Sequence, residues 1–310
     1  MKQSEHHKQA VQTTGHAWDG DIQEYNNPLP RWWVWTFFGT VVFAVVYWLI
    51  YPAWPVGRSY TKGLFNTITF QTRDGQEVTT HWNTRSRFIA DMQRGEAAVK
   101  QREYLEKIGQ SSYQDIVNDP DKMGFVLSMS KVLFADNCAA CHGAGAQGKI
   151  GLFPNLVDDD WLWGGTFEDI HQTIANGRLG FMPPFRDTFN AEDLRALAAF
   201  VLSLSGITDE HDAARVARGR EIFTGEEGGC YYCHGKDARG MKSQGSANLT
   251  DKIWTVADVP GAPTYEAKLQ AVEEVIQNGI NRRMPAWKGR LSEEQIKLLT
   301  VYIHQLGGGQ

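Results

Sequence analysis

Two short cysteine–histidine motifs constrain this chain more than any other feature. They are Cys138-Ala139-Ala140-Cys141-His142 and Cys230-Tyr231-Tyr232-Cys233-His234. In such a motif, two thiols three positions apart can each add to one vinyl group of a haem, and the next imidazole can then bind the iron. A redox C-x-x-C pair does not require the histidine, and a four-thiolate zinc site does not require two histidines. The motifs therefore predict two covalently bound haem c groups, with His142 and His234 as iron ligands.

Length, charge and cysteine usage limit the class of protein. The 310 residues suit two small globular domains plus additional segments. All four cysteines lie in the two motifs, and covalent haem attachment belongs to an oxidising compartment such as the bacterial periplasm. The net charge of −5 gives no basic face for phosphates, so nucleic acid is excluded as a partner.

One segment near the N-terminus is apolar enough to cross a membrane. Trp32 to Tyr51 is a run of twenty uncharged residues with aromatic side chains at both ends. As a helix it spans ~30 Å, the thickness of a bilayer hydrocarbon core, and Pro52 and Pro55 end it. We therefore predict a transmembrane anchor at residues 32–54, retained as an uncleaved single pass in the bacterial inner membrane.

The haem motifs determine the expected orientation, because the charges on the two sides of the anchor are balanced. Haem is attached outside the cytoplasm, so residues 1–31 are predicted to be a short flexible cytoplasmic tail, with His6, His7 and His16 solvated. Residues 55–120 are predicted to be a partly helical periplasmic connector. Within it we expect a turn at Arg73-Asp74-Gly75 and helix from about 84 to 109.

The remaining sequence repeats one plan twice. Ile174-Ala175-Asn176-Gly177 corresponds to Ile276-Gln277-Asn278-Gly279, and a Met-Pro pair follows each at the same distance, Met182-Pro183 and Met284-Pro285. Both repeats open with an amphipathic helix before the haem motif and close with another, at about 191–203 and 292–306. The fold class is therefore mainly α: one transmembrane helix and two tandem cytochrome c domains, residues 121–206 and 211–308.

The two repeated methionines are the expected sixth ligands, Met182 and Met284. A haem iron held by histidine and a thioether has no open position for substrate and a raised potential, which is typical of an electron carrier and predicts no catalytic site in this chain. A dihaem peroxidase would need an open sixth position, and a haem-based sensor would need a signalling domain. Met241, close after the second motif, is the main competitor of Met284. Spacing alone favours each domain using its own methionine.

Further residues are expected around the haems. A ligating imidazole needs a partner for its other nitrogen, and the repeat offers the carbonyls of Pro154 and Ala247. Trp161 and Trp254 either donate to haem propionates or pack in the core. The arginines near the Met-Pro pairs either neutralise haem propionates or lie in solvent. They are Arg178, Arg282 and Arg283.

The haem motifs, the Met-Pro loops and the single N-terminal helix together resemble the CcoP/FixP family, the dihaem subunit of cbb3-type cytochrome c oxidases. The most specific similarity is the stretch from Gly15-His16-Ala17-Trp18-Asp19-Gly20 to Pro28-Leu29-Pro30-Arg31-Trp32-Trp33. Unlike some members, which begin with an additional apolar helix, this chain begins with a polar tail. The resemblance implies Cys138, Cys141, Cys230 and Cys233 as haem attachment residues, and it implies that Met284 serves the first haem and Met182 the second.

The resemblance also implies a role and partners. Such a subunit accepts electrons from a donor c-type cytochrome and passes them through a monohaem cytochrome c subunit to the catalytic haem b/copper subunit, which reduces oxygen with proton pumping. The alternative is a free-standing membrane-anchored dihaem cytochrome that carries electrons between respiratory complexes. The N-terminal stretch favours the oxidase subunit.

Overall fold

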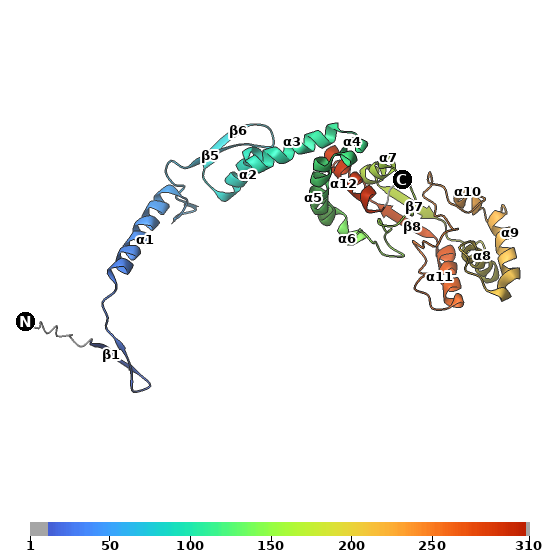
Figure 1. The fold of residues 1–310 in the computed structure, drawn as a ribbon, viewed down its shortest axis with the longest axis horizontal. Coiled ribbons are helices and arrows are strands. Elements are labelled where there is room, and N and C mark those ends of the chain that lie inside the picture. The colour runs from blue at the N-terminus through green and yellow to red at the C-terminus, as the bar shows by residue number, and fades with distance from the viewer. Residues whose placement is uncertain (1–11, 308–310) are drawn as a thin grey trace, which may run out of the picture. The chain divides into compact units, whose positions relative to one another are not determined.

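The computed structural model describes residues 12–307, which form two compact units, one up to residue 100 and one from residue 101 onward (Figure 1). The predicted connector is therefore divided between the two units. The first unit contains β1 Thr13–Trp18, β2 Ile22–Tyr25, α1 Arg31–Ile50, β3 Pro55–Val56, β4 Ser59–Tyr60, β5 Thr67–Gln71, β6 Glu77–His81 and α2 Thr84–Arg94. Helix α3, Glu96–Gln110, begins at its end.

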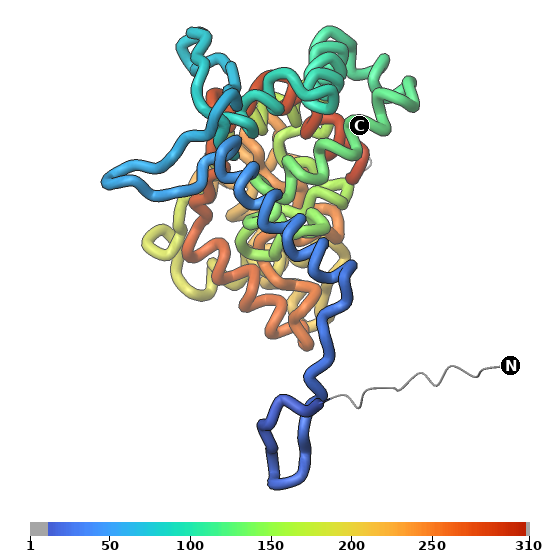
Figure 2. The backbone as a smooth tube through the Cα atoms, turned by 90° about the vertical axis from the view of Figure 1, so that its left-hand side faces the viewer, coloured from blue at the N-terminus to red at the C-terminus, as the bar shows by residue number. Residues whose placement is uncertain are grey.

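Part of the predicted flexible tail forms an antiparallel hairpin of β1 and β2, which Figure 2 shows in blue before α1. The turn uses Asp19 and Gly20, which have positive φ values of 51° and 87°. Asp-Gly is favoured in hairpin turns because these residues tolerate such angles. His16 lies in β1, whereas His6 and His7 lie outside the described residues.

Helix α1 has the length and composition of a membrane span. Apart from Arg31 at its start, its 20 residues carry no charge and are apolar on all sides, and none of them is buried in the described chain. A helix that is apolar all round needs an apolar environment on every face. The helix therefore has the length, composition and exposure of a membrane anchor, as the sequence predicts.

After α1 the first unit continues with two short hairpins and a helix. Strands β3 and β4 pair, and β5 pairs with β6 from Thr67↔His81 to Gln71↔Glu77. The predicted turn at Arg73-Asp74-Gly75 joins β5 to β6, with the Gly75 N–H donating to the Thr72 carbonyl at 3.0 Å. The predicted helix from about 84 to 109 is confirmed as α2 and α3, separated at Gly95.

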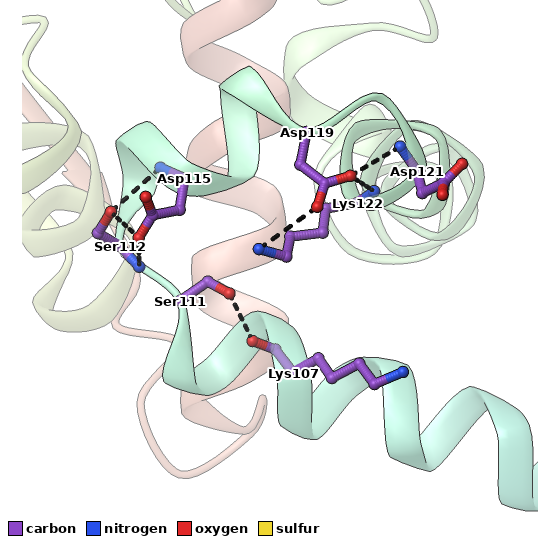
Figure 3. A network of polar contacts seen from close by, with 7 residues as sticks. All are labelled: Lys107, Ser111, Ser112, Asp115, Asp119, Asp121 and Lys122. Atoms are coloured by element: carbon purple, nitrogen blue, oxygen red, sulfur yellow. Dashed lines mark hydrogen bonds and ion pairs between the residues drawn. The ribbon is translucent and has the colours of Figure 1, made fainter.

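Capping side chains set the turns between the first helices of the second unit (Figure 3). Ser112 and Asp115 form a capping box at the start of α4, Tyr113–Asn118. Asp119 accepts from the backbone N–H groups of Asp121 and Lys122 and caps α5, Pro120–Asn137. These caps satisfy backbone donors that a helix start leaves without partners. They therefore stabilise the two turns at the starts of α4 and α5, before the first haem motif.

The second unit contains the two haem motifs. Its remaining elements are α6 Ala139–His142, α7 Phe167–Asn176, β7 Arg178–Met182, α8 Ala191–Leu204, the 3₁₀ helix η1 Glu210–Asp212, α9 Ala213–Thr224, α10 Tyr231–His234, α11 Tyr265–Asn278, β8 Ile280–Met284 and α12 Glu293–Leu306. The predicted opening and closing helices of both repeats are confirmed as α5, α8, α9 and α12.

The closing helices are exchanged between the two repeats. Helix α12, the end of the second repeat, packs against α5 and α7 of the first, while α8 packs against α9 and α11 of the second (Figure 1). One core joins Leu197 and Leu202 of α8 to Phe223 and Leu269, and another joins Phe134 to Ile296 and Leu299 of α12. The two spatial halves therefore do not follow the two sequence repeats.

An antiparallel ribbon of β7 and β8 connects the halves. Arg178 pairs with Met284, Gly180 with Arg282, and Met182 with Ile280. Strand β7 follows α7, and strand β8 follows α11. The two strands run in opposite directions between the two cores.

Candidate functional site

Both haem motifs fold as one helical turn after a longer helix. In the first, the backbone N–H groups of Cys141 and His142 donate to the Cys138 carbonyl at 3.1 and 3.0 Å. In the second, Cys233 and His234 bond the Cys230 carbonyl at 3.2 and 2.9 Å. Gly143 and Gly235, with φ of 80° and 77°, end the turns. Each turn keeps two thiols and one imidazole close together.

The imidazoles of both motifs are held by backbone carbonyls. His142 Nδ1 lies 3.1 Å from the Pro154 oxygen, and His234 Nδ1 lies 3.0 Å from the Ala247 oxygen. These are the two predicted carbonyls, so that prediction is confirmed. Burial lowers the pKa of both histidines, although the bond to the carbonyl acts in the opposite direction. Each ring is therefore neutral, with Nδ1–H donating and Nε2 available to bind a metal.

In each motif the first thiol is partly buried and the second is exposed. Burial is the main cause that raises the pKa of Cys138 and Cys230 to about 11, with a smaller contribution at each from the second thiol of its motif. Within residues 12–307, no three side chains of His, Cys, Asp or Glu form a group that can hold a metal ion. The spacing of each motif is that of covalent haem attachment, which uses both thiols and the histidine.

A largely apolar cavity adjoins the second motif. It is lined by Cys230, His234 and Trp254 of the second repeat and by Met182 of the first. Apolar side chains make up most of its walls, with Leu197, Phe223 and Leu249 among them. This lining suits a mainly apolar group beside the imidazole.

The methionine that lines this cavity comes from the other repeat, and the first motif shows the converse arrangement. Met284 packs into the core that contains Cys138, Leu156 and Trp161, next to the first motif. Met241 lies in the loop after the second motif, where its backbone N–H donates to Ser246 Oγ at 2.8 Å. The geometry therefore brings Met182 to the second motif and Met284 to the first, as the resemblance implies and against the pairing that spacing favours.

The ribbon explains how each methionine reaches the other half. Gly177 and Gly279 precede the strands with φ of 69° and 67°, and a Cβ at either position would collide with the backbone of the opposite Met-Pro pair. The loops after the strands are bonded reciprocally: the Phe185 N–H donates to the Ile276 carbonyl at 3.1 Å, and the Trp287 N–H donates to the Ile174 carbonyl at 3.1 Å. The Met-Pro loops are thus attached to the helices of the opposite repeat.

The tryptophan and arginine candidates differ in their surroundings. Trp161 Nε1 is buried and has no hydrogen-bond partner within the described chain, whereas Trp254 lines the cavity. The Arg178 guanidinium lies 4.7 Å from the Trp163 ring centre, and Arg282 donates to the Gly151 carbonyl. Arg283 points to the exposed face of the ribbon. A buried N–H without a partner is costly, so Trp161 is suited to donate to an anionic group of a bound cofactor.

These observations together test whether haem suits the sites. Each site has a neutral imidazole with a free Nε2, two thiols and a thioether, and the first has a buried donor without a partner. Sequence reasoning found all of these residues. It missed the ribbon. The matching positions of the two Met-Pro loops were a signal for it, because equivalent segments can pair across a twofold axis.

Comparison with known proteins is consistent with this geometry. A family model described as the N-terminal domain of cytochrome oxidase-cbb3, FixP, matches residues 10–58, and one described as cytochrome c oxidase, cbb3-type, subunit III, matches residues 129–201 and 214–303. The second covers both haem motifs and both closing helices.

Full-length relatives support the same assignment. The chain is 42% identical over 309 residues to the cbb3-type cytochrome c oxidase subunit FixP of Azorhizobium caulinodans, covering 96% of this chain and 94% of the relative. It is 36% identical to the subunit CcoP of Cereibacter sphaeroides over 309 residues, covering 96% and 95%. The subunit CcoP of Azospirillum brasilense is 36% identical over 313 residues, with 97% and 96% covered. The chain therefore belongs to the CcoP/FixP family of cytochrome c subunits of cbb3-type cytochrome c oxidases.

Proposed function

We propose that this chain binds two haem c groups and accepts electrons for a cbb3-type oxidase. Cys138 and Cys141 would attach one haem, and Cys230 and Cys233 the other. His142 and Met284 would be the axial ligands of the first iron, and His234 and Met182 those of the second. The observation that carries this proposal is the placement of Met182 in the cavity of His234 and of Met284 beside the first motif.

The residues around each site favour electron transfer over catalysis. A bound haem c supplies a one-electron iron couple, and a methionine ligand raises its potential. The carbonyls of Pro154 and Ala247 hold the imidazoles in one orientation through Nδ1. An imidazole and a thioether would together hold each iron and would leave no position for substrate, so we assign no catalytic site to this chain.

The surroundings of the chain follow from this role. We propose that residues 12–30 face the cytoplasm and that the chain after α1 lies in the periplasm of a bacterial inner membrane, where haem is attached. The donor is a c-type cytochrome, and the acceptors are a monohaem cytochrome c subunit and, through it, the catalytic haem b/copper subunit. The names of the relatives support an assembly of this kind.

The decisive experiment is isolation of the tagged chain from its native membrane in mild detergent. The expected result is co-purification of a haem b and copper subunit with oxygen-consuming activity and two haem c per chain. Recovery of the dihaem chain alone would favour the free-standing electron shuttle. A single haem c per chain would contradict the proposed sites.

A further inference from the structure

A short loop between β4 and β5 exposes two apolar side chains next to the end of α1. Phe65 is fully exposed and Leu64 is 56% exposed. Phe65 also has a φ of 59°, in the left-handed region that residues other than glycine rarely adopt. Packing within the chain does not explain why an exposed aromatic side chain is held in this conformation.

The loop is fixed to the last turn of α1. The Leu64 N–H donates to the Leu49 carbonyl at 2.8 Å, and a Cβ at Gly63 would collide with the Ile50 carbonyl. The Leu49 carbonyl is one of the groups that a helix end leaves without a partner inside the helix. The loop therefore lies at the same level along the helix axis as Leu49 and Ile50.

This level corresponds to the boundary of a bilayer. A helix of 20 residues is about 30 Å long, which matches the hydrocarbon core, so its last turn lies at the edge of that core. Trp48 and Trp54 contact each other there, with ring centres 4.7 Å apart, and Thr61 fixes Trp54 through its N–H and hydroxyl. Tryptophan is enriched at membrane interfaces.

Two cations accompany the apolar loop. Arg58 lies in the turn between β3 and β4, and Lys62 directly precedes Gly63; both are exposed. Long basic side chains at this level extend toward lipid phosphates while their stems lie against apolar groups. Exposed apolar side chains with cations beside them are the pattern of an interfacial membrane contact.

We propose that Leu64 and Phe65 insert into the lipid interface at the C-terminal end of α1, as a second membrane contact of this chain. Arg58 and Lys62 face the lipid phosphates beside it. This inference depends on the membrane anchoring by α1 that the proposed function includes.

The four native cysteines allow a specific test. All of them are occupied in the haem-loaded chain, so Phe65→Cys supplies one free thiol for an environment-sensitive dye. Val42→Cys, in the middle of α1, reports the anchor itself, and Asp74→Cys, in the turn between β5 and β6, reports an exposed position of the same unit. The labelled full-length chains are placed in vesicles of phosphatidylcholine and phosphatidylglycerol and quenched with nitroxide lipids or with aqueous iodide.

The expected result is that the dye at position 65 is quenched by head-group nitroxide lipid and loses most of the iodide quenching seen at position 74. A dye at position 65 that behaves like the dye at 74 overturns the proposal, provided that the dye at 42 is quenched by lipid. A dye at 65 shielded from both quenchers also overturns it, because that result indicates a protein contact. If the dye at 42 is not quenched by lipid, the anchoring itself is wrong.

Discussion

Met182 lines the same cavity as His234, although the two residues belong to different sequence repeats. The β7–β8 ribbon produces this relationship, because Met182 lies at one end of the ribbon opposite Ile280 and Met284 lies at the other end opposite Arg178. The second motif thus receives Met182 from the first repeat, and the first motif receives Met284 from the second repeat. Mutation of either methionine should therefore affect the haem of the other repeat.

We expect Met182→Ala to affect the haem of His234 and Met284→Ala to affect the haem of His142. Loss of the thioether lowers the reduction potential and opens the iron to carbon monoxide. The test uses a chain that retains only the haem of His234. Cys138→Ala and Cys141→Ala together remove the first attachment site. In that background, Met182→Ala should create carbon monoxide binding.

In the same background, Met284→Ala should leave the remaining haem closed to carbon monoxide. Met241→Ala is the control for loss of a nearby methionine and should leave the spectrum of the remaining haem unchanged. If Met284→Ala opens the remaining haem, each domain uses its own methionine and the exchange is wrong.

We expect Gly177→Ala and Gly279→Ala to disturb the methionine of the opposite strand. An added methyl at Gly177 collides with the Met284 carbonyl, and one at Gly279 lies 2.5 Å from the Met182 carbonyl. Gly206→Ala is the matched control, since Gly206 has a φ of 81° but a methyl added there has nothing within 4 Å. All three have a positive φ that disfavours a side chain. At Gly177 and Gly279 the ψ values of −179° and −173° place the backbone in a region that essentially only glycine adopts, which costs about 1–3 kcal/mol.

The measurements for these variants are thermal unfolding and the absorption band of methionine-ligated iron. Gly177→Ala and Gly279→Ala should lower the stability by more than Gly206→Ala and weaken this band, whereas Gly206→Ala should leave the band intact. Equal loss of stability in all three, with the band unchanged, would show that the close approach does not position the methionines.

The sequence predicted the local features of the haem sites well. Pro154 and Ala247 each directly precede the Asn-Leu pair of their repeat, and the imidazole bonds to both are present. The β1–β2 hairpin was missed although Asp19-Gly20 is a hairpin signal. That signal is easily overlooked because residues 13–25 have no core to pack against.

The exchange of helices was not predictable from local patterns. Helices α8 and α12 occupy equivalent repeat positions and have similar apolar faces, so either haem core can bury either helix. The choice depends on the path of the chain through the ribbon, which brings Ser130 Oγ within 3.1 Å of the Leu298 carbonyl. A contact between residues so far apart in the chain produces no periodic pattern in the sequence.

We expect Trp161→Phe to lower the reduction potential of the first haem. The buried Trp161 Nε1 has no partner within the described chain, and a bond from it to a propionate would offset negative charge near the iron. Losing that donor favours the oxidised iron. The expected shift is of the order of tens of mV, where about 59 mV is a tenfold change in a one-electron equilibrium.

Redox titration of the two haems measures this shift. The second haem is the internal control, because Trp161 packs in the core of the first. An unchanged potential of the first haem together with a loss of thermal stability would mean that Trp161 acts only through packing.

The acidic segment Asp158–Asp160 should make stability depend on pH. Burial, together with repulsion from Asp251 and Asp158, raises the pKa of Asp160 to about 6. A carboxyl with a raised pKa binds its proton more tightly in the folded chain, so its contribution to stability is complete below about pH 4 and is lost as the pH rises through about 6. The loss is at most about 2–3 kcal/mol, since one pKa unit is about 1.4 kcal/mol.

Asp160→Asn removes the ionisable group, so the free energy of unfolding should become less dependent on pH between about 4 and 6. Above pH 6 we expect the variant to be more stable than the parent chain, because no buried charge is left to desolvate. Asp159→Asn, at an exposed neighbouring carboxylate, is the control for a change in net charge. Denaturant unfolding of the haem-loaded chain at a series of pH values gives these slopes. Parallel pH profiles for the parent and Asp160→Asn would contradict the raised pKa.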